Sequence, residues 1–369
     1  MSTPLPRPFS VYLDLVRFLA ACLVYLYHSN QRWLVQPILP FSDYGHSAVI
    51  VFFVLSGYVI AYVAHEKERD WASYAASRIS RLYSVAVPAV ALTLLLDWGG
   101  RHLLPEVNNY PFDAFALRIL GSLLMANEVW FVSITSFSNV PYWSICYESW
   151  YYVAFGLCVY LPRRRAIWLC AALALVLGPK IALLAPVWAM GTLLFHWRRL
   201  AEIPQATGWL FALAGAAGIA LFFLLGVEAA AGAWFESLLG KRLYTEFTFS
   251  RFFLGDYLLG ALVTLHFAGM RRIAHQLARP ILAIEVPVRK LAAYTFTLYL
   301  LHQPLFLFWG SVINGDNRGY GSWALATALM AVSVVVVGAL TENQRHRLTA
   351  RIRSRLLALA SACQQRWRA

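Results

Sequence analysis

Long apolar runs alternate with short polar segments along most of the chain. A helix needs about 20 apolar residues to cross a bilayer, with about 17 as the lower limit. The runs cover residues 11–28, 48–64, 80–97, 143–161, 166–178, 180–197, 209–226, 251–268, 292–310 and 322–340. The pattern predicts an all-α polytopic membrane protein with about ten transmembrane helices. The run 166–178 is short, and together with 180–197 it predicts a tight hairpin or a re-entrant pair.

Composition agrees with a membrane environment. The chain has 369 residues, of which 60% are hydrophobic and 13% charged, too few polar groups to cover a water-facing surface. Its five cysteines show no disulfide framework and no zinc-ligand spacing, so no bound metal is expected. Composition alone does not separate an enzyme from a transporter.

Charge predicts the orientation in the membrane. Most of the 31 Lys and Arg residues fall in segments that share one side if the N-terminus is inside, and such residues concentrate in cytoplasmic loops. We therefore expect both termini in the cytoplasm. Topology and attraction to anionic lipid then explain the net charge of +13, and no nucleic acid is expected as a partner. Residues 1–342 form the membrane-embedded domain, and 343–369 form a basic tail, either an amphipathic surface helix or a solvated charge run.

The first apolar run contains Asp14, Arg17 and His28. Ionisable groups at this depth are costly unless they face partners or water, so they are functional candidates. Arg17 and His28 are about three helical turns apart, on one face and roughly 16 Å apart along the axis. Arg17 suits a phosphate or carboxylate, and His28 can accept a proton from a hydroxyl. The alternative is that Asp14 and Arg17 form a structural pair and His28 marks an interface.

The next two runs hold a small-residue pair and an arginine pair. Ser56 and Gly57 lie among bulky residues, which favours close helix packing or close approach to a thin ligand chain. Arg78 and Arg81 are three residues apart on one helix face at the membrane border. They could clamp a phosphate-rich donor or simply anchor the helix.

Two later runs contain further candidates. Glu148 follows Trp143 and Ser144 at the start of a run, where it could orient or charge-stabilise His28 or merely face water. His302 lies in mid-run, two residues before Pro304. The histidine could assist the chemistry, or the backbone carbonyl that Pro304 frees could satisfy it locally.

These motifs in this order resemble acyltransferase family 3, the integral membrane O-acyltransferases, over residues 14–340. The matching motifs are Arg17 with His28, the FFxLSG segment 52–57, Arg78 with Arg81, the W-S-x-x-x-E motif of Trp143, Ser144 and Glu148, and the Y-x-x-H-x-P pattern of Tyr299, His302 and Pro304. One departure is Ile50, where many members carry Asp.

The resemblance implies a bacterial inner-membrane enzyme that transfers an acyl group, commonly acetyl, from cytoplasmic acyl-CoA to a carbohydrate hydroxyl at the outer face. The acceptor would be part of a lipopolysaccharide, an exopolysaccharide or another glycan. Acyl-CoA is then a co-substrate, and no permanently bound cofactor is expected. On this view His28 and Glu148 are catalytic, and Arg17, Arg78 and Arg81 hold the donor. An acceptor that is a lipid or small metabolite, a glycan or anion transporter, and a homo-oligomer stay open.

Overall fold

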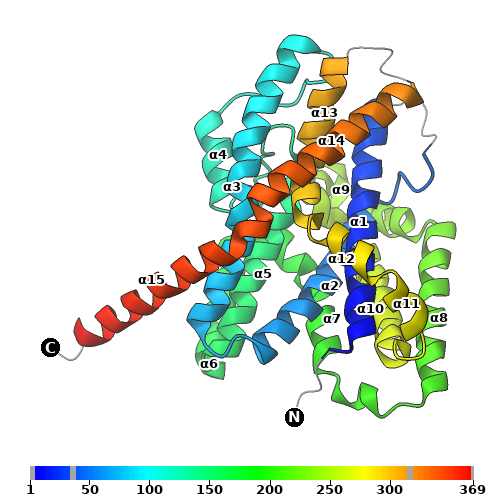
Figure 1. The fold of residues 1–369 in the computed structure, drawn as a ribbon, viewed down its shortest axis with the longest axis vertical. Helices are drawn as coiled ribbons and strands as arrows, with labels where there is room; N and C mark the ends of the chain where they lie inside the picture. Colours follow the sequence, from blue (N-terminus) through cyan, green and yellow to red (C-terminus); the bar gives the residue numbers. More distant parts are fainter. Residues whose placement is uncertain (1–4, 34–38, 314–318, 367–369) are drawn as a thin grey trace.

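The computed structural model describes residues 5–33, 39–313 and 319–366, which are helical almost throughout and contain no strand (Figure 1). This confirms the all-α polytopic fold. The α-helices are α1 (Arg7–Trp33), α2 (Gly45–Glu66), α3 (Trp71–Leu103), α4 (Phe115–Leu123), α5 (Trp143–Tyr160), α6 (Arg163–Leu177), α7 (Pro179–His196), α8 (Gln205–Leu224), α9 (Val227–Glu246), α10 (Phe253–Ile273), α11 (Ala278–Ala283), α12 (Glu285–Ala292), α13 (Thr295–Ile313), α14 (Tyr320–Leu340) and α15 (Arg345–Arg366). Short 3₁₀ turns are η1 (Val140–Tyr142), η2 (Arg198–Ala201), η3 (Thr248–Phe252) and η4 (Glu342–Gln344).

Eight helical segments in the described ranges are long and apolar enough to cross a membrane, two fewer than the ten predicted runs. The two runs that fall short are 143–161 and 166–178. Helix α6 has 15 residues, about 22 Å at 1.5 Å per residue, which is less than the hydrocarbon thickness of about 30 Å. Helix α5 is 18 residues long, but Ser144, Glu148 and several tyrosines reduce its hydropathy.

The outer faces of the long helices suit lipid. Leu210, Leu213 and Leu221 of α8 are exposed, as are Val332 and Val335 of α14. Their spacing places each set on one side of its helix. Apolar surfaces of this extent are unusual on a soluble monomer. They fit an integral membrane protein whose backbone polar groups are satisfied within helices.

Helices α2 and α7 cross at two glycines. A Cβ atom on Gly57 would lie 2.0 Å from the backbone oxygen of Trp188, and one on Gly191 would lie 1.9 Å from the backbone oxygen of Val54. The small residues therefore let the two backbones touch. Gly57 packs helices here and does not line the cavity described below, so packing explains it better than contact with a donor.

The described part of the basic tail forms α15, which follows α14 after the η4 turn. Its first half packs on α3: the hydroxyl oxygens of Ser80 and Thr349 are 2.6 Å apart, and Arg353 lies 3.6 Å from Asp70. Its far end projects away from the other helices (Figure 1). The tail is thus a helix whose beginning belongs to the helical bundle.

Candidate functional site

A cavity of about 760 Å³ lies where helices from both ends of the chain meet, and we call it the basic cavity. Its walls come from α1, α2, α3, α5, α12, α13 and the α14–α15 junction. Lys67, Asn343 and Arg345 line it and are exposed, so they mark its mouth. The charged side chains of its lining are Asp14, Arg17, Lys67, Arg78, Arg81, Glu148, Arg289, Glu342 and Arg345. Lys67, Arg78, Arg81, Arg289 and Arg345, which come from segments that the charge pattern assigns to one membrane side, therefore converge here.

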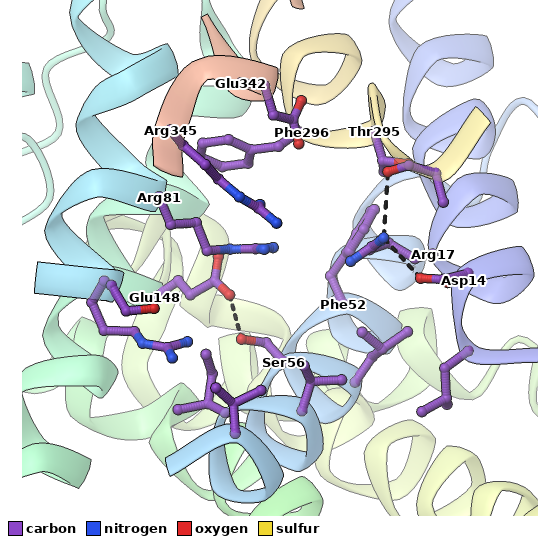
Figure 2. A pocket seen from close by; sticks show the side chains of 18 of the residues that line it. Asp14, Arg17, Phe52, Ser56, Arg81, Glu148, Thr295, Phe296, Glu342 and Arg345 are labelled. Atoms are coloured by element: carbon purple, nitrogen blue, oxygen red, sulfur yellow. Dashed lines mark hydrogen bonds and ion pairs between the residues drawn. The ribbon is translucent and has the colours of Figure 1, made fainter. Parts of the chain in front are cut away.

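Glu148 lies in the wall of the basic cavity and not beside His28. Its carboxylate accepts a hydrogen bond from the hydroxyl of Ser56 (Figure 2) and another from the hydroxyl of Tyr152 at 2.6 Å. The Ser56 oxygen also accepts from the indole nitrogen of Trp188 at 3.2 Å. Tyr152 is one helical turn after Glu148, so α5 itself aligns the two groups. Between Glu148 and His28, both of them described, no hydrogen bond or ion pair forms.

Arg17 is partly paired. It donates to Asp14 at 2.8 Å and to the backbone oxygen of Ala292 at 3.3 Å, and Arg289 donates to the second Asp14 oxygen at 3.0 Å. The Asp14–Arg17 pair predicted as a structural alternative is therefore present. The buried Nε of Arg17 has no hydrogen-bond partner in the described part of the chain. Arg17 can thus still bind an anion in the cavity.

The short helix α12 is bound to the start of α1 through Glu285. Glu285 accepts from Arg7 at 2.6 Å and from Arg289 at 2.8 Å. Hydrogen bonds from Arg7, and then from Arg289, lower the pKa of Glu285 to about 2. The carboxylate therefore stays ionised at neutral pH. This link holds the start of α12 against α1, and the Ala292 carbonyl at the other end of the short helix accepts from Arg17.

The two arginines of α3 differ in their surroundings. Arg78 forms an ion pair with Glu68 at 2.6 Å, and each side chain is 7% exposed. Its guanidinium lies 5.2 Å from the Tyr74 ring centroid. Arg81 extends toward the centre of the basic cavity, where the guanidiniums of Arg17 and Arg345 also point (Figure 2). Both α3 arginines line the cavity. The charge of Arg78 is neutralised by Glu68, whereas Arg81 forms no ion pair with a described residue and its charge faces the cavity.

His28 and His302 form a pair outside the basic cavity. Their ring centroids are 5.3 Å apart. The His302 Nδ1 donates to the backbone oxygen of Leu298 at 3.0 Å, so in the neutral ring Nε2 is an acceptor. That Nε2 is buried and has no partner among the described residues. The carbonyl that Pro304 frees, on Leu300, does not serve His302.

Asn139 uses that carbonyl instead. Its side-chain amide donates to the Leu300 oxygen at 2.7 Å. The prediction that the freed carbonyl could satisfy His302 is wrong, because this carbonyl accepts from Asn139, which precedes α5, and His302 donates to Leu298 instead. The histidine pair therefore retains a free acceptor nitrogen.

Ser144 and Trp143 have separate surroundings. The Ser144 hydroxyl lines the cavity and lies 2.6 Å from the Tyr299 hydroxyl. The Tyr299 ring is 6.3 Å from His302 and 5.4 Å from Phe52, so it stands between the cavity and the histidine pair. Trp143 stacks on Phe249 with centroids 4.3 Å apart and packs the core.

Sequence reasoning missed two polar pairs. One is a true ion pair, in which Lys180 lies 2.6 Å from Glu128 and joins α7 to the segment before α5. The other is a hydrogen-bonded contact, in which the Nε2 of the partly buried His46 lies 3.0 Å from the buried Asp256 and joins α2 to α10. It also missed Tyr152 and Arg345 as parts of the cavity. Helical spacing from Glu148 could have indicated Tyr152, whereas the pairs and Arg345 depend on tertiary contacts between distant segments.

Fold and site together define an integral membrane protein with a charged cavity between its helices. The family model described as an acyltransferase domain, Acyl_transf_3, matches residues 10–342, and the chain belongs to this family, acyltransferase family 3. The chain is also similar to the acyltransferase MdmB of Streptomyces mycarofaciens, at 27% identity over 92% of each chain. No solved structure matches the chain. The protein is thus a membrane acyltransferase by family.

Proposed function

We propose that the protein is an O-acyltransferase that moves an acyl group, most simply acetyl, from cytoplasmic acyl-CoA to a carbohydrate hydroxyl at the outer face of a bacterial inner membrane. The observation that carries the proposal is the basic cavity, which combines arginines near its mouth with the Glu148–Ser56–Tyr152 cluster in its wall. Family membership supplies the reaction class. The cavity supports a donor that is anionic at one end and neutral at the other.

The arrangement suits acyl-CoA as that donor. Its nucleotide phosphates would bind Arg17 and Arg81, because guanidinium groups pair with phosphate oxygens in a bidentate geometry. Its pantetheine arm and thioester would extend along the wall past Ser56. Acyl-CoA is then consumed as a co-substrate and does not reside in the protein.

The chemistry would take place toward His28. The acceptor hydroxyl oxygen attacks the thioester carbonyl carbon, the new C–O bond forms, the C–S bond breaks, and His28 takes the hydroxyl proton. The protonated His28 then gives this proton to the departing thiolate, so that the products are the ester and CoA thiol and His28 is neutral again. His302 would position His28, since the rings are neighbours. Direct transfer and a covalent acyl-enzyme both fit.

The path from donor to acceptor runs past Phe52 and Tyr299. Both side chains line the cavity, and the Tyr299 ring is next to that of His302. A thioester that reaches His28 must displace the Tyr299 ring or slide along it. The Ser144–Tyr299 hydrogen bond fixes the ring where the passage would open.

Two other readings compete with this proposal. A lipid or a small metabolite could be the acceptor, because the acceptor hydroxyl is needed only near His28. A glycan or anion transporter could use the same charged interior, but membership of an acyltransferase family favours an enzyme.

In the test, radiolabelled acetyl-CoA is added to membranes that contain wild-type or Arg81→Gln protein. The glycan, lipid and small-molecule fractions are then separated and their label is measured. The proposal expects label in the glycan fraction with wild type and much less with Arg81→Gln at low donor concentration. Label found only in the lipid or small-molecule fraction would show that the acceptor is a lipid or a small metabolite and not a carbohydrate. Absence of label with wild type and an acceptor-rich extract would contradict the proposed reaction.

A further inference from the structure

The first turns of α15 form part of the basic cavity. Arg345, His346 and Thr349 line it, although all three follow residue 342, where the family match ends. The contact between Thr349 and Ser80 on α3 fixes the first turns of α15 in this position. The start of the basic tail is therefore a wall of the cavity and not a free extension.

Three guanidiniums point into the same space. Figure 2 shows Arg345, Arg81 and Arg17 directed toward the centre of the cavity from α15, α3 and α1. Such like charges repel one another more strongly in a partly enclosed site than in bulk water. An arrangement of this kind is stabilised when an anion binds between them.

The acidic groups nearby are already engaged. Asp14 accepts from Arg17 and Arg289, and Glu148 accepts from Ser56 and Tyr152. The Glu342 carboxylate accepts from the backbone nitrogen of Thr297 at 3.0 Å and from its hydroxyl at 2.9 Å.

The Arg345 guanidinium has no hydrogen-bond partner among the described residues, and it is near the mouth. The basic side chains of the cavity thus outnumber the acidic ones, and Arg345 is the least committed of the three converging guanidiniums. Its donors are available to an anion that enters from the mouth.

We propose that Arg345 binds a nucleotide phosphate of the acyl-CoA donor, so that the start of α15 completes the donor site. The inference rests on the proposed function. Because Arg345 is at the mouth and Glu148 is in the wall further along the donor path, the phosphate end of the donor stays near α15 while the thioester points inward. Arg345 acts on binding, since it lines the mouth of the cavity, whereas His28 and His302 are not part of the cavity lining.

The experiment compares wild type and Arg345→Gln with three donors: acetyl-CoA, acetyl-dephospho-CoA, which lacks the 3′-phosphate, and S-acetylpantetheine, which lacks the whole nucleotide. Arg345→Gln should raise KM for acetyl-CoA on the order of tenfold or more, with kcat changed less than about twofold, because a charge-assisted contact to the donor is lost. With S-acetylpantetheine the two proteins should have the same KM. A penalty that disappears already with acetyl-dephospho-CoA assigns Arg345 to the 3′-phosphate.

Arg351→Gln is the matched control, because Arg351 is exposed on the same helix and does not line the cavity. An equal loss with all three donors, or the same loss in Arg351→Gln, would overturn the inference. A binding titration with CoA separates this failure from that of the proposed function. Wild type and Arg345→Gln that bind CoA equally well refute the role of Arg345 alone, whereas a wild type that binds no CoA refutes both proposals.

Discussion

Replacement of Gly57 by Ala tests the close crossing of α2 and α7. The added Cβ would lie 2.0 Å from the Trp188 backbone oxygen and 3.1 Å from its carbonyl carbon. Ordinary contact begins near 3.4 Å, so the helices must separate by about 1.4 Å, because backbone atoms cannot rotate away as a side chain could. Overpacking of this kind costs about 1–3 kcal/mol. Gly57→Ala should therefore lower the free energy of unfolding by about that amount.

The assay is reversible unfolding of purified protein in mixed detergent micelles, followed by tryptophan fluorescence. Gly321→Ala is the control, because a Cβ at Gly321 in α14 meets nothing within 4 Å and alanine favours helix by up to about 1 kcal/mol. The control should be as stable as wild type or slightly more stable. Wild-type stability in Gly57→Ala would refute the packing role. If donor KM rose at the same time, Gly57 would contact the donor.

Other substitutions separate the roles of the cavity residues. Arg78→Gln leaves Glu68 buried without its partner, at a cost of about 3–5 kcal/mol, so Western blots should show little protein in membranes; normal accumulation would contradict the buried pair. Arg81→Gln should accumulate normally and raise KM for acetyl-CoA in initial-rate assays, and an unchanged KM would remove Arg81 from the donor site. Glu148→Gln keeps the shape of the side chain but removes its charge, and kcat should fall at least tenfold. Tyr152→Phe deletes one hydrogen bond to the charged Glu148, about 1.5–3 kcal/mol, so kcat should fall by roughly ten- to a hundredfold; a larger loss than in Glu148→Gln would give Tyr152 a direct role.

Much of the architecture could be predicted from local pattern. Apolar runs identify helices because the bilayer requires length and hydropathy that a sequence displays directly. The same criterion explains the two runs that fall short, 143–161 and 166–178. Depth and charge indicate Arg17, Arg78 and Arg81 as candidates to bind an anion, the family resemblance implies that the anion is the donor, and the structure brings all three to one cavity.

The partners of these residues could not be predicted, because they come from segments distant in sequence. Glu148 was expected to orient His28, but its hydrogen bonds go to Ser56 on α2 and to Tyr152. His28 instead lies beside His302 on α13. Sequence spacing fixes which face of a helix a residue occupies, while the neighbour of that face depends on how the helices pack.

The tail illustrates the same limit. Its composition indicates a basic helix, yet nothing in the pattern around Arg345 shows that this residue returns to the cavity. Only the packing of α15 on α3, through contacts such as Ser80 with Thr349, brings it there. The family match ends at residue 342, yet residues on both sides of that boundary line the same cavity.

The most direct test of acyl transfer through His28 uses proteoliposomes that contain wild-type or His28→Ala protein, radiolabelled acetyl-CoA and a glycan acceptor extract. Circular dichroism and size-exclusion chromatography in detergent establish that both proteins are folded. The account predicts labelled glycan and stoichiometric CoA thiol release with wild type, and neither with His28→Ala. Equal labelling by folded His28→Ala would contradict the assignment of the reaction to the His28–His302 pair.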